Sequence, residues 1–278
     1  MKIRSLLPTG LAVATAAVAI AAALMSTHAR AQFGGEVAPE IPSDSWKFSA
    51  GLGAASGPLY PGSSERKTRA LPVISAGYGR YFIGGVPGAG IPAGIGAFLV
   101  QDSHWRLGVG LGGNFEKPRK ESDSVRLRGL GDIDRTALGS VFGSYTEKWF
   151  SATAGVLTDI GGKHQGTRIA LDFEGKYRLM DRLVVSAGPG VTWADSNYTQ
   201  TFFGIDATQS ARSGLSPYTP KSGINSIRFG VGADYRLTER WGIGARLTAA
   251  SLRGDAARSP ITEKKAQNSF GAFAAYRF

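Results

Sequence analysis

The stretch IRFGVGADYRL, residues 227–237, alternates between two kinds of side chain, and the next stretch, WGIGARLTA at 241–249, does the same. In each stretch one set of alternate positions is apolar and the other is rich in Gly and Arg. Side chains of a β-strand point to opposite faces in turn, so a period of two predicts strands. Each stretch is about ten residues long, which suits a tilted strand that crosses a membrane better than the shorter strands of soluble sheets.

The same alternation recurs outward from this pair, for example in TRIALDFEGKYRL at 167–179 and WKFSAGLGA at 46–54. Short polar turns, such as those at 147–148 and 238–239, separate some runs, whereas long polar segments, such as 196–223, separate the others. We expect twelve strands, at 45–55, 68–78, 80–85, 92–101, 104–114, 133–146, 149–159, 167–179, 183–194, 224–237, 241–252 and 267–278.

Short turns at one end and long loops at the other are typical of transmembrane β-barrels, in which the short turns face the periplasm. Backbone groups at an open sheet edge cannot face lipid, so the sheet must close. The predicted fold is therefore all-β, a closed antiparallel transmembrane barrel over residues 45–278. Ten strands remain an alternative to twelve, because the third run is short and the sixth places apolar residues on both faces.

The first residues read as an export signal. Lys2 and Arg4 precede an apolar, Ala-rich stretch, and Ala29-Arg30-Ala31 is a small-x-small cleavage site. We expect a signal peptide at 1–31, cleaved after Ala31, followed by a periplasmic N-terminal segment at 32–44. The apolar stretch is long enough to span a bilayer, so an uncleaved anchor is the alternative.

Composition excludes several classes of protein. The chain has no Cys and only three His among 278 residues, which excludes thiolate chemistry and leaves little material for a His-based metal site or triad. The net charge is +11, and removal of a signal with three basic residues and no acid leaves +8. Export of a basic chain disfavours nucleic acid as a partner and favours anionic envelope polymers.

Strand parity predicts a basic lumen. If the apolar face of each run meets lipid, the opposite face points inward. Ten basic side chains then line the lumen, against the acidic Asp172, Glu174 and Asp234. The ten are Lys47, Arg69, Arg106, Arg168, Lys176, Arg178, Arg228, Arg236, Arg246 and Arg277. Such a lumen favours anions. The alternative is that these side chains pair with the acids and with backbone carbonyls and plug the barrel.

Aromatic residues at the strand ends predict contacts with the membrane and with the assembly machinery. Five tryptophans fall at strand ends and are expected to anchor the membrane interfaces, namely Trp46, Trp105, Trp149, Trp193 and Trp241. In the last strand Tyr276 and Phe278 share the apolar parity. An aromatic end on such a strand is typical of the signal that the barrel assembly machinery reads.

The motifs that suggest chemistry are weak. Residues 108–113, GVGLGG, match a dinucleotide-binding pattern but lie inside an alternating run, where glycines more often make room in a narrow lumen. Asp132 and Asp134, with Asp123, could hold calcium, yet neighbouring arginines favour a salt-bridged loop. The aromatic cluster of Tyr198, Phe202 and Phe203 either packs within its own loop or binds a partner.

Several segments resemble the MltA-interacting protein family of outer-membrane proteins, in the same order along the mature chain. They are PLYPGS at 58–63 with Leu71-Pro72, GDID at 131–134, ADSNYTQTFFGI at 194–205, SGL at 213–215 with Tyr218, GDAARSPI at 254–261 and YRF at 276–278. The resemblance implies an outer-membrane barrel and a role in scaffolding a murein lytic transglycosylase with a murein synthase. Other members of the family are described as porin-like or adhesin-like. The family offers no catalytic residues to transfer.

Together these features predict a non-enzymatic barrel of the Gram-negative outer membrane, with no catalytic residue, no metal site and no cofactor. The expected partners are outer-membrane lipid and lipopolysaccharide, the barrel assembly machinery, and, by resemblance, a murein lytic transglycosylase and a murein synthase. Two alternatives remain: a narrow porin-like channel with anion preference, and a surface adhesin-like barrel.

Overall fold

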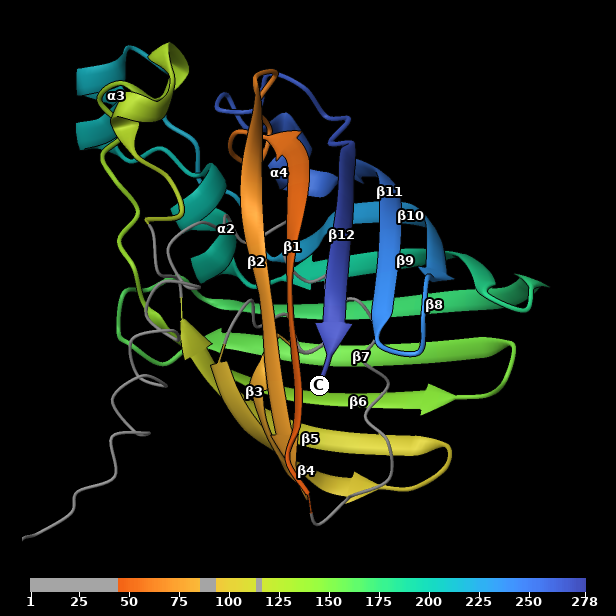
Figure 1. Ribbon diagram of the computed structural model, residues 1–278. Coiled ribbons are helices and arrows are strands. Elements are labelled where there is room, and N and C mark those ends of the chain that lie inside the picture. Colours follow the sequence, from red (N-terminus) through yellow and green to blue (C-terminus); the bar gives the residue numbers. More distant parts are fainter. Residues whose placement is uncertain (1–44, 86–93, 114–116) are drawn as a thin grey trace, which may run out of the picture.

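Twelve antiparallel strands form one closed barrel in the computed structural model, which describes residues 45–85, 94–113 and 117–278 (Figure 1). Each strand pairs with its neighbours in sequence, and β1 closes the barrel against β12. The strands are β1 Lys47–Pro58, β2 Arg66–Tyr78, β3 Tyr81–Gly84, β4 Gly94–Gln101, β5 Trp105–Gly113, β6 Ala137–Thr146, β7 Phe150–Asp159, β8 Thr167–Met180, β9 Leu183–Ala194, β10 Gly223–Arg236, β11 Trp241–Leu252 and β12 Ser269–Arg277. The prediction of twelve strands is confirmed.

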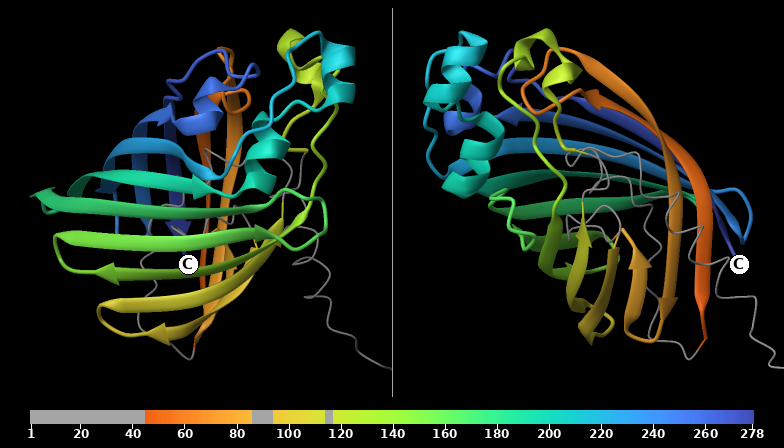
Figure 2. Two further views of the ribbon diagram at one scale, coloured as in Figure 1. Left: turned by 180° about the vertical axis from the view of Figure 1, so that it is seen from behind. Right: turned by 90° about the vertical axis from the view of Figure 1, so that its left-hand side faces the viewer.

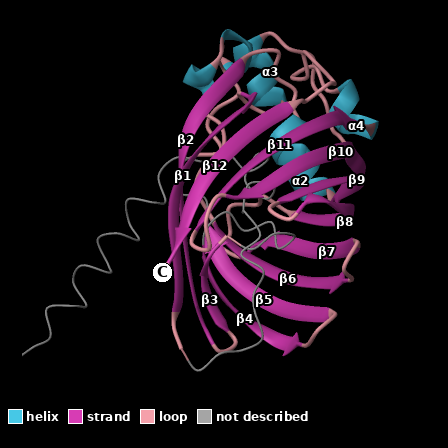
Figure 3. Cartoon of the chain, turned by 45° about the vertical axis from the view of Figure 1, so that its right-hand side comes forward, coloured by secondary structure: helices cyan, strands magenta, loops and turns pink. Residues whose placement is uncertain are grey.

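The two ends of the barrel differ as the sequence indicates. Turns of a few residues join β2 to β3, β4 to β5, β6 to β7, β8 to β9 and β10 to β11. Long segments at the other end carry the helices α2 Ser196–Phe203, α3 Ala207–Ser213 and α4 Gly254–Arg258, with the 3-10 turns η1 Glu121–Asp123 and η2 Val125–Leu127. Figures 2 and 3 show these helices gathered at the long-loop end. None of the helices in the described part of the chain is both long and apolar enough to span a membrane.

Alternation places the apolar side chains on the outside. On β10 the outward side chains Ile227, Phe229 and Val231 are exposed, whereas Arg228 between them is half-buried on the lumenal side. An exposed apolar band on a closed barrel is the surface that lipid covers. The prediction that the apolar face of each run points outward therefore accounts for the long series of exposed Leu, Ile, Val and Phe side chains.

The start of the sixth strand differs from the one that the sequence predicts. The sequence predicts a strand from residue 133, but β6 begins at Ala137. Ile133 instead forms an isolated bridge with Arg119 and is buried among the long loops. The mixed faces of this run also have a physical reason, because Leu138 and Phe142 are buried on the lumenal side while Val141 faces outward. The lumen is locally apolar there, so apolar residues occupy both faces.

Candidate functional site

One lumenal wall, formed by β8, β10 and β11, carries paired charges. Asp172 on β8 accepts two hydrogen bonds from Arg228 on β10, at 2.9 Å from Nε and 2.6 Å from Nη2. The third bond of Arg228, from Nη1, goes to the Thr192 hydroxyl at 2.6 Å. Asp234 accepts from Arg246 Nη2 at 2.5 Å. All three acids expected in the lumen thus have a basic partner, because Glu174 lies 3.7 Å from Lys176.

The members of these pairs differ in exposure. The side chains of Asp172, Glu174 and Asp234 are 36–39% exposed, whereas those of Arg228, Lys176 and Arg246 are only 14–15% exposed. The cations therefore lie against the wall, and solvent in the lumen meets the carboxylates first. Such pairing neutralises three of the ten basic residues expected in the lumen, so these three add little to its positive electrostatic potential.

The opposite wall, on β3 to β6, carries an aromatic cluster that the sequence does not predict. Phe82, Phe98 and Phe142 form a cluster with ring centroids 5.1–6.1 Å apart. Glycines on neighbouring strands make room for these rings. A Cβ at Gly96 would lie 2.2 Å from Phe82 Cζ, and one at Gly108 would lie 2.5 Å from Phe142 Cζ. The GVGLGG stretch therefore lies in the wall of the barrel, as expected if its glycines make room in a narrow lumen.

The remaining basic residues of the lumenal set are distributed along the barrel. Lys47, Arg69 and Arg106 are half-buried and have partners within the protein. Arg168, near the long-loop end, lies over the ring of Tyr198 at 5.1 Å, a cation–π contact. The other three, Arg178, Arg236 and Arg277, are exposed at the short-turn end.

The long loops fold into a cap with hydrophobic cores of its own. One core brings together Tyr198, Phe202 and Phe203 of α2 with Leu252 and Ala256. A second core joins five buried side chains from four separate loop segments, namely Tyr60, Leu127, Leu130, Ile205 and Ile261. The aromatic cluster of residues 198–203 therefore packs within the protein. The fully buried large side chains of the described chain lie in this cap and not in the barrel wall.

A buried cation lies within the cap. Arg119 is 2% exposed and donates from Nη1 to the carbonyl of Phe202 at 3.1 Å, at the end of α2. Burial lowers the pKa of Arg119 to about 10, since a guanidinium is costly to bring out of water. Burial also raises the pKa of Tyr60, and the neighbouring Glu263 carboxylate, which accepts its hydroxyl hydrogen bond, raises it further.

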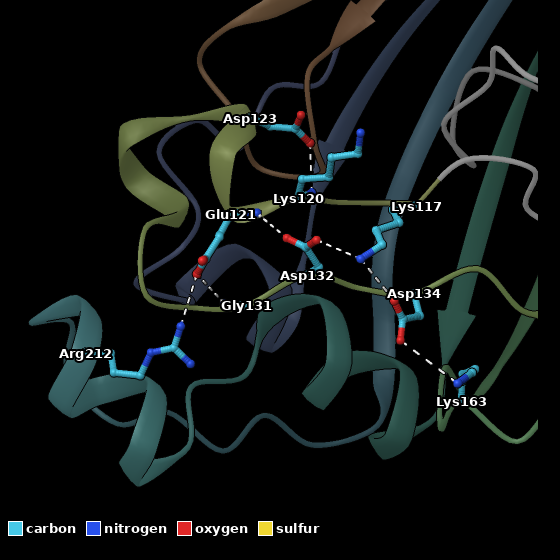
Figure 4. A network of polar contacts seen from close by, with 9 residues as sticks. All are labelled: Lys117, Lys120, Glu121, Asp123, Gly131, Asp132, Asp134, Lys163 and Arg212. Carbon is cyan, nitrogen blue, oxygen red and sulfur yellow. Dashed lines mark hydrogen bonds and ion pairs between the residues drawn. The ribbon is translucent and has the colours of Figure 1, made fainter.

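The acidic cluster considered for calcium is an ion-paired loop. Lys117 lies 2.8 Å from Asp132 and 3.3 Å from Asp134, and Arg212 of α3 lies 3.3 Å from Glu121 (Figure 4). The hydrogen bond from Lys117 holds the pKa of Asp132 below its usual value. Within the described ranges no three His, Asp or Glu side chains are grouped as metal ligands. Lys117 and Lys163 thus pair with the aspartates, and Arg212 pairs with Glu121.

The short-turn end, which we call the rim, is rich in exposed aromatic side chains. Of the five tryptophans expected to anchor the interfaces, Trp46, Trp105, Trp149 and Trp241 lie at this end and are exposed. Trp193 lies at the long-loop end of β9. Phe278 is 76% exposed and touches Tyr276 edge-on. The anchoring and assembly roles of these residues stay predictions.

The two remaining His candidates occupy ordinary surface positions. His104 lies in the β4–β5 turn with Nε2 3.5 Å from Glu147, and both side chains are partly exposed. His164 is exposed in the loop after β7, with a φ of 55°. His104 Nδ1 lies 2.8 Å from the Ser103 hydroxyl, so Ser103, His104 and Glu147 form a chain of contacts on the exposed turns of the barrel.

Fold and surface together define an outer-membrane β-barrel protein. The family model for the MltA-interacting protein MipA matches residues 50–278, and the chain belongs to this family. Its location is the outer membrane. The export signal and the segment at 32–44 lie outside the described residues and stay predictions.

Comparison with known proteins gives distant relatives. YiaT of Escherichia coli (strain K12), named as an outer membrane protein, is 24% identical over 84% of this chain and 91% of its own length. The MltA-interacting protein of the same strain is 26% identical over 52% of this chain and 58% of its own length. Among solved structures, the NanC porin aligns with 84% of this chain and 99% of its own, at 10% identity and a TM-score of 0.42. An outer membrane channel from Pseudomonas putida F1 aligns with 88% and 99%, at 8% identity and a TM-score of 0.44.

Proposed function

We propose that the protein is a non-enzymatic docking protein of the outer membrane, which holds a murein lytic transglycosylase at the envelope. The observation that carries this proposal is the loop cap. Its two hydrophobic cores are built from segments far apart in sequence and bury Tyr198, Phe203 and Ile261 almost completely. A packed cap at the long-loop end suits an open pore poorly, and it leaves the short-turn end as the surface on which a periplasmic enzyme can dock.

The paired lumenal wall supports the same proposal. Arg228 and Arg246 are tied to carboxylates and to Thr192, and Arg168 is stacked on the cap residue Tyr198. These contacts pair the lumenal charges with groups inside the protein. The distant relative named MltA-interacting protein supports a partner of the MltA kind. The family resemblance implies that this partner is a murein lytic transglycosylase and that a murein synthase is a second one.

The test is capture of the full-length, detergent-solubilised protein on an immobilised, purified murein lytic transglycosylase. We expect saturable retention of the folded barrel, and no retention on an immobilised unrelated periplasmic enzyme of similar charge. Folding is checked by migration in SDS gels before and after boiling, because a closed barrel resists SDS until it is heated. Equal retention on both columns contradicts the proposal.

A narrow channel with anion preference is the second candidate, and one observation favours it. The lumenal carboxylates are more than a third exposed, so solvent reaches that wall. Arg178, Arg236 and Arg277 of the expected basic set are exposed at the short-turn mouth, which favours anions over cations there. In planar bilayers under a KCl gradient, this candidate predicts a reversal potential on the Cl⁻ side. Preference for K⁺ contradicts a basic lumen, and absence of conductance leaves the docking role alone.

A further inference from the structure

Five arginines gather on one half of the rim. Arg178 and Arg182 flank the turn between β8 and β9, Arg236 and Arg240 flank the turn between β10 and β11, and Arg277 ends β12. All five side chains are exposed. We call this set the arginine arc. It follows the periplasmic mouth of the barrel across five neighbouring strands.

Hydrogen bonds between the turns hold the members of the arc side by side. The Arg236 amide donates to the carbonyl of Arg182 at 2.8 Å, and the Arg277 amide donates to the carbonyl of Arg240 at 2.9 Å. Neighbouring strands lie about 5 Å apart, so these residues are adjacent along the rim. The arc is thus a fixed row of cations and not a chance feature of one flexible loop.

Most N–H donors of the guanidinium groups in the arc have no acceptor within the described part of the protein. Arg182 donates to the Leu237 carbonyl at 3.3 Å, Arg236 to the Asp181 carbonyl at 3.4 Å and Arg240 to the Tyr276 hydroxyl at 2.9 Å. Across the described ranges, none of the ion pairs involves an arc residue. A guanidinium has five N–H donors, so most of them point into solvent.

The other half of the rim has fewer exposed cations. Its turns carry the exposed Arg80 and Lys148 against Asp102 and Glu147, and its strand ends add Lys47 and Arg106, which are half-buried and have partners within the protein. Both acids are engaged locally, since Asp102 accepts the amides of His104 and Trp105 and Glu147 accepts the Tyr145 hydroxyl. In the arc, by contrast, five guanidinium groups face only two turn carboxylates, Asp181 and Glu239. The rim is therefore electrostatically lopsided.

Strand parity turns the strand members of the arc away from the lipid. Arg178 shares its face with Lys176, and Arg236 shares its face with Asp234, both of which belong to the lumenal wall. Their neighbours Tyr177 and Tyr235 point to the outside. Arg240, in a turn, instead contacts the outward Tyr276 hydroxyl and lies at the outer edge of the arc. The strand members of the arc therefore face a partner that approaches the mouth from the periplasm.

We propose that the arginine arc binds the carboxylate groups of murein stem peptides, so that the barrel is attached to the murein beside its docked enzyme. This inference deepens the proposed docking function and rests on it. Guanidinium forks match carboxylates with two parallel hydrogen bonds. A row of separate cations suits a polymer with repeated carboxylates, whereas a single small anion would need a convergent pocket. Each exposed contact is weak, but several on one polymer add through multivalency.

The test is co-sedimentation of the full-length barrel in detergent with purified murein sacculi. The triple variant Arg182→Gln, Arg236→Gln, Arg240→Gln is compared with the matched double variant Arg80→Gln, Lys148→Gln from the other half of the rim. We expect the triple variant to lose affinity roughly tenfold and the double variant to bind as the unchanged protein does. Binding of the unchanged protein should weaken as NaCl rises, because salt screens exposed charges.

Two further arms need no variant. Sacculi whose carboxylates are converted to amides should retain little protein, and vesicles of phosphatidylglycerol should not compete for it. Equal binding of the triple variant and the unchanged protein, full binding to amidated sacculi, or competition by the vesicles overturns the proposal. Capture on the immobilised transglycosylase is measured in parallel. Retention of that capture without sacculus binding overturns the arc alone, whereas loss of capture with sacculus binding overturns the docking function alone.

Discussion

The cap and the rim differ in how far their large side chains are buried. In the cap, Tyr198, Phe203 and Ile261 are shielded almost completely by segments that lie far apart in sequence. At the rim, Trp149 and Phe278 are about 70% exposed or more, and the arginine arc forms no ion pair among the described residues. Burial of apolar surface stabilises the cap as it stabilises a soluble domain. The aromatic and basic side chains of the rim lack such packing, so the rim is the end that we propose acts on other molecules.

The largest effect is expected at the rim, from deletion of Phe278. Its side chain contributes little packing within the fold, since it is exposed and touches mainly Tyr276. If the assembly machinery reads this aromatic end, most of the protein should disappear from the outer membrane, as measured by immunoblotting of membrane fractions. Phe278→Tyr, which keeps the ring, is the control. Unchanged levels of the deletion variant would show that Phe278 is not part of the signal.

In the cap, Phe203→Ala should remove a fully buried ring. Substitutions of this kind cost about 3–5 kcal/mol, so the cap should open locally. Limited proteolysis of intact cells would detect faster cleavage in the loops, while heat-dependent migration of the barrel in SDS gels stays unchanged. Val125→Ala is the matched control in the same cap, because Val125 is 72% exposed. Equal protection of both variants would mean that the cap does not behave as a packed unit.

Between the two ends, Asp172→Asn should destabilise the lumenal wall by about 1–3 kcal/mol, because Arg228 would keep its buried position without its charged partner. The measurement is the urea midpoint of barrel unfolding in detergent micelles. Asp181→Asn, in the exposed turn of the rim, should shift this midpoint little. A comparable shift for both variants would show that the lumenal pair is no more important than a surface charge.

The smallest effect concerns pH and the ion-paired loop of the cap. Hydrogen bonding from Lys117 lowers the pKa of Asp132, so the folded state favours the ionised carboxylate. The resulting stabilisation is present above the unfolded pKa of about 3.9 and is lost as pH falls through the lower folded value. The Glu121 amide, which donates to Asp132, should exchange faster below that range once the intrinsic pH dependence of exchange is removed. Lys117→Met should move the loss to higher pH.

Local patterns in the sequence predict the wall of the barrel well. The period of two recurs in almost every run, and lipid outside a closed sheet demands it, so strand positions such as 183–194 and 241–252 are found without error. Outward and inward parity follow from the same pattern. The start of β6 fails because Ile133 continues the apolar pattern while its partner, Arg119, lies outside the strand.

The partners of the lumenal side chains depend on closure. Asp172 and Arg228 are 56 residues apart and meet because β8, β9 and β10 are adjacent at a fixed register. The aromatic cluster is equally non-local. Only the pairing of β4 with β5 and of β5 with β6 brings Gly108 beneath the ring of Phe142. The alternation in the sequence predicts which charged side chains point inward, but it does not predict which of them form ion pairs.

The sequence by itself determines that this protein carries an excess of positive charge and forms a barrel of about twelve strands, and it predicts an export signal. These features rest on short-range periodicity and composition, which do not depend on distant contacts. Only the tertiary structure decides that the long loops pack into a cap with its own cores, that Arg228 and Arg246 are paired, and that five rim arginines lie in a row. Those features arise where segments far apart in sequence meet, and such meetings follow from strand register and from the packing of Tyr60, Leu127 and Ile261 into one core.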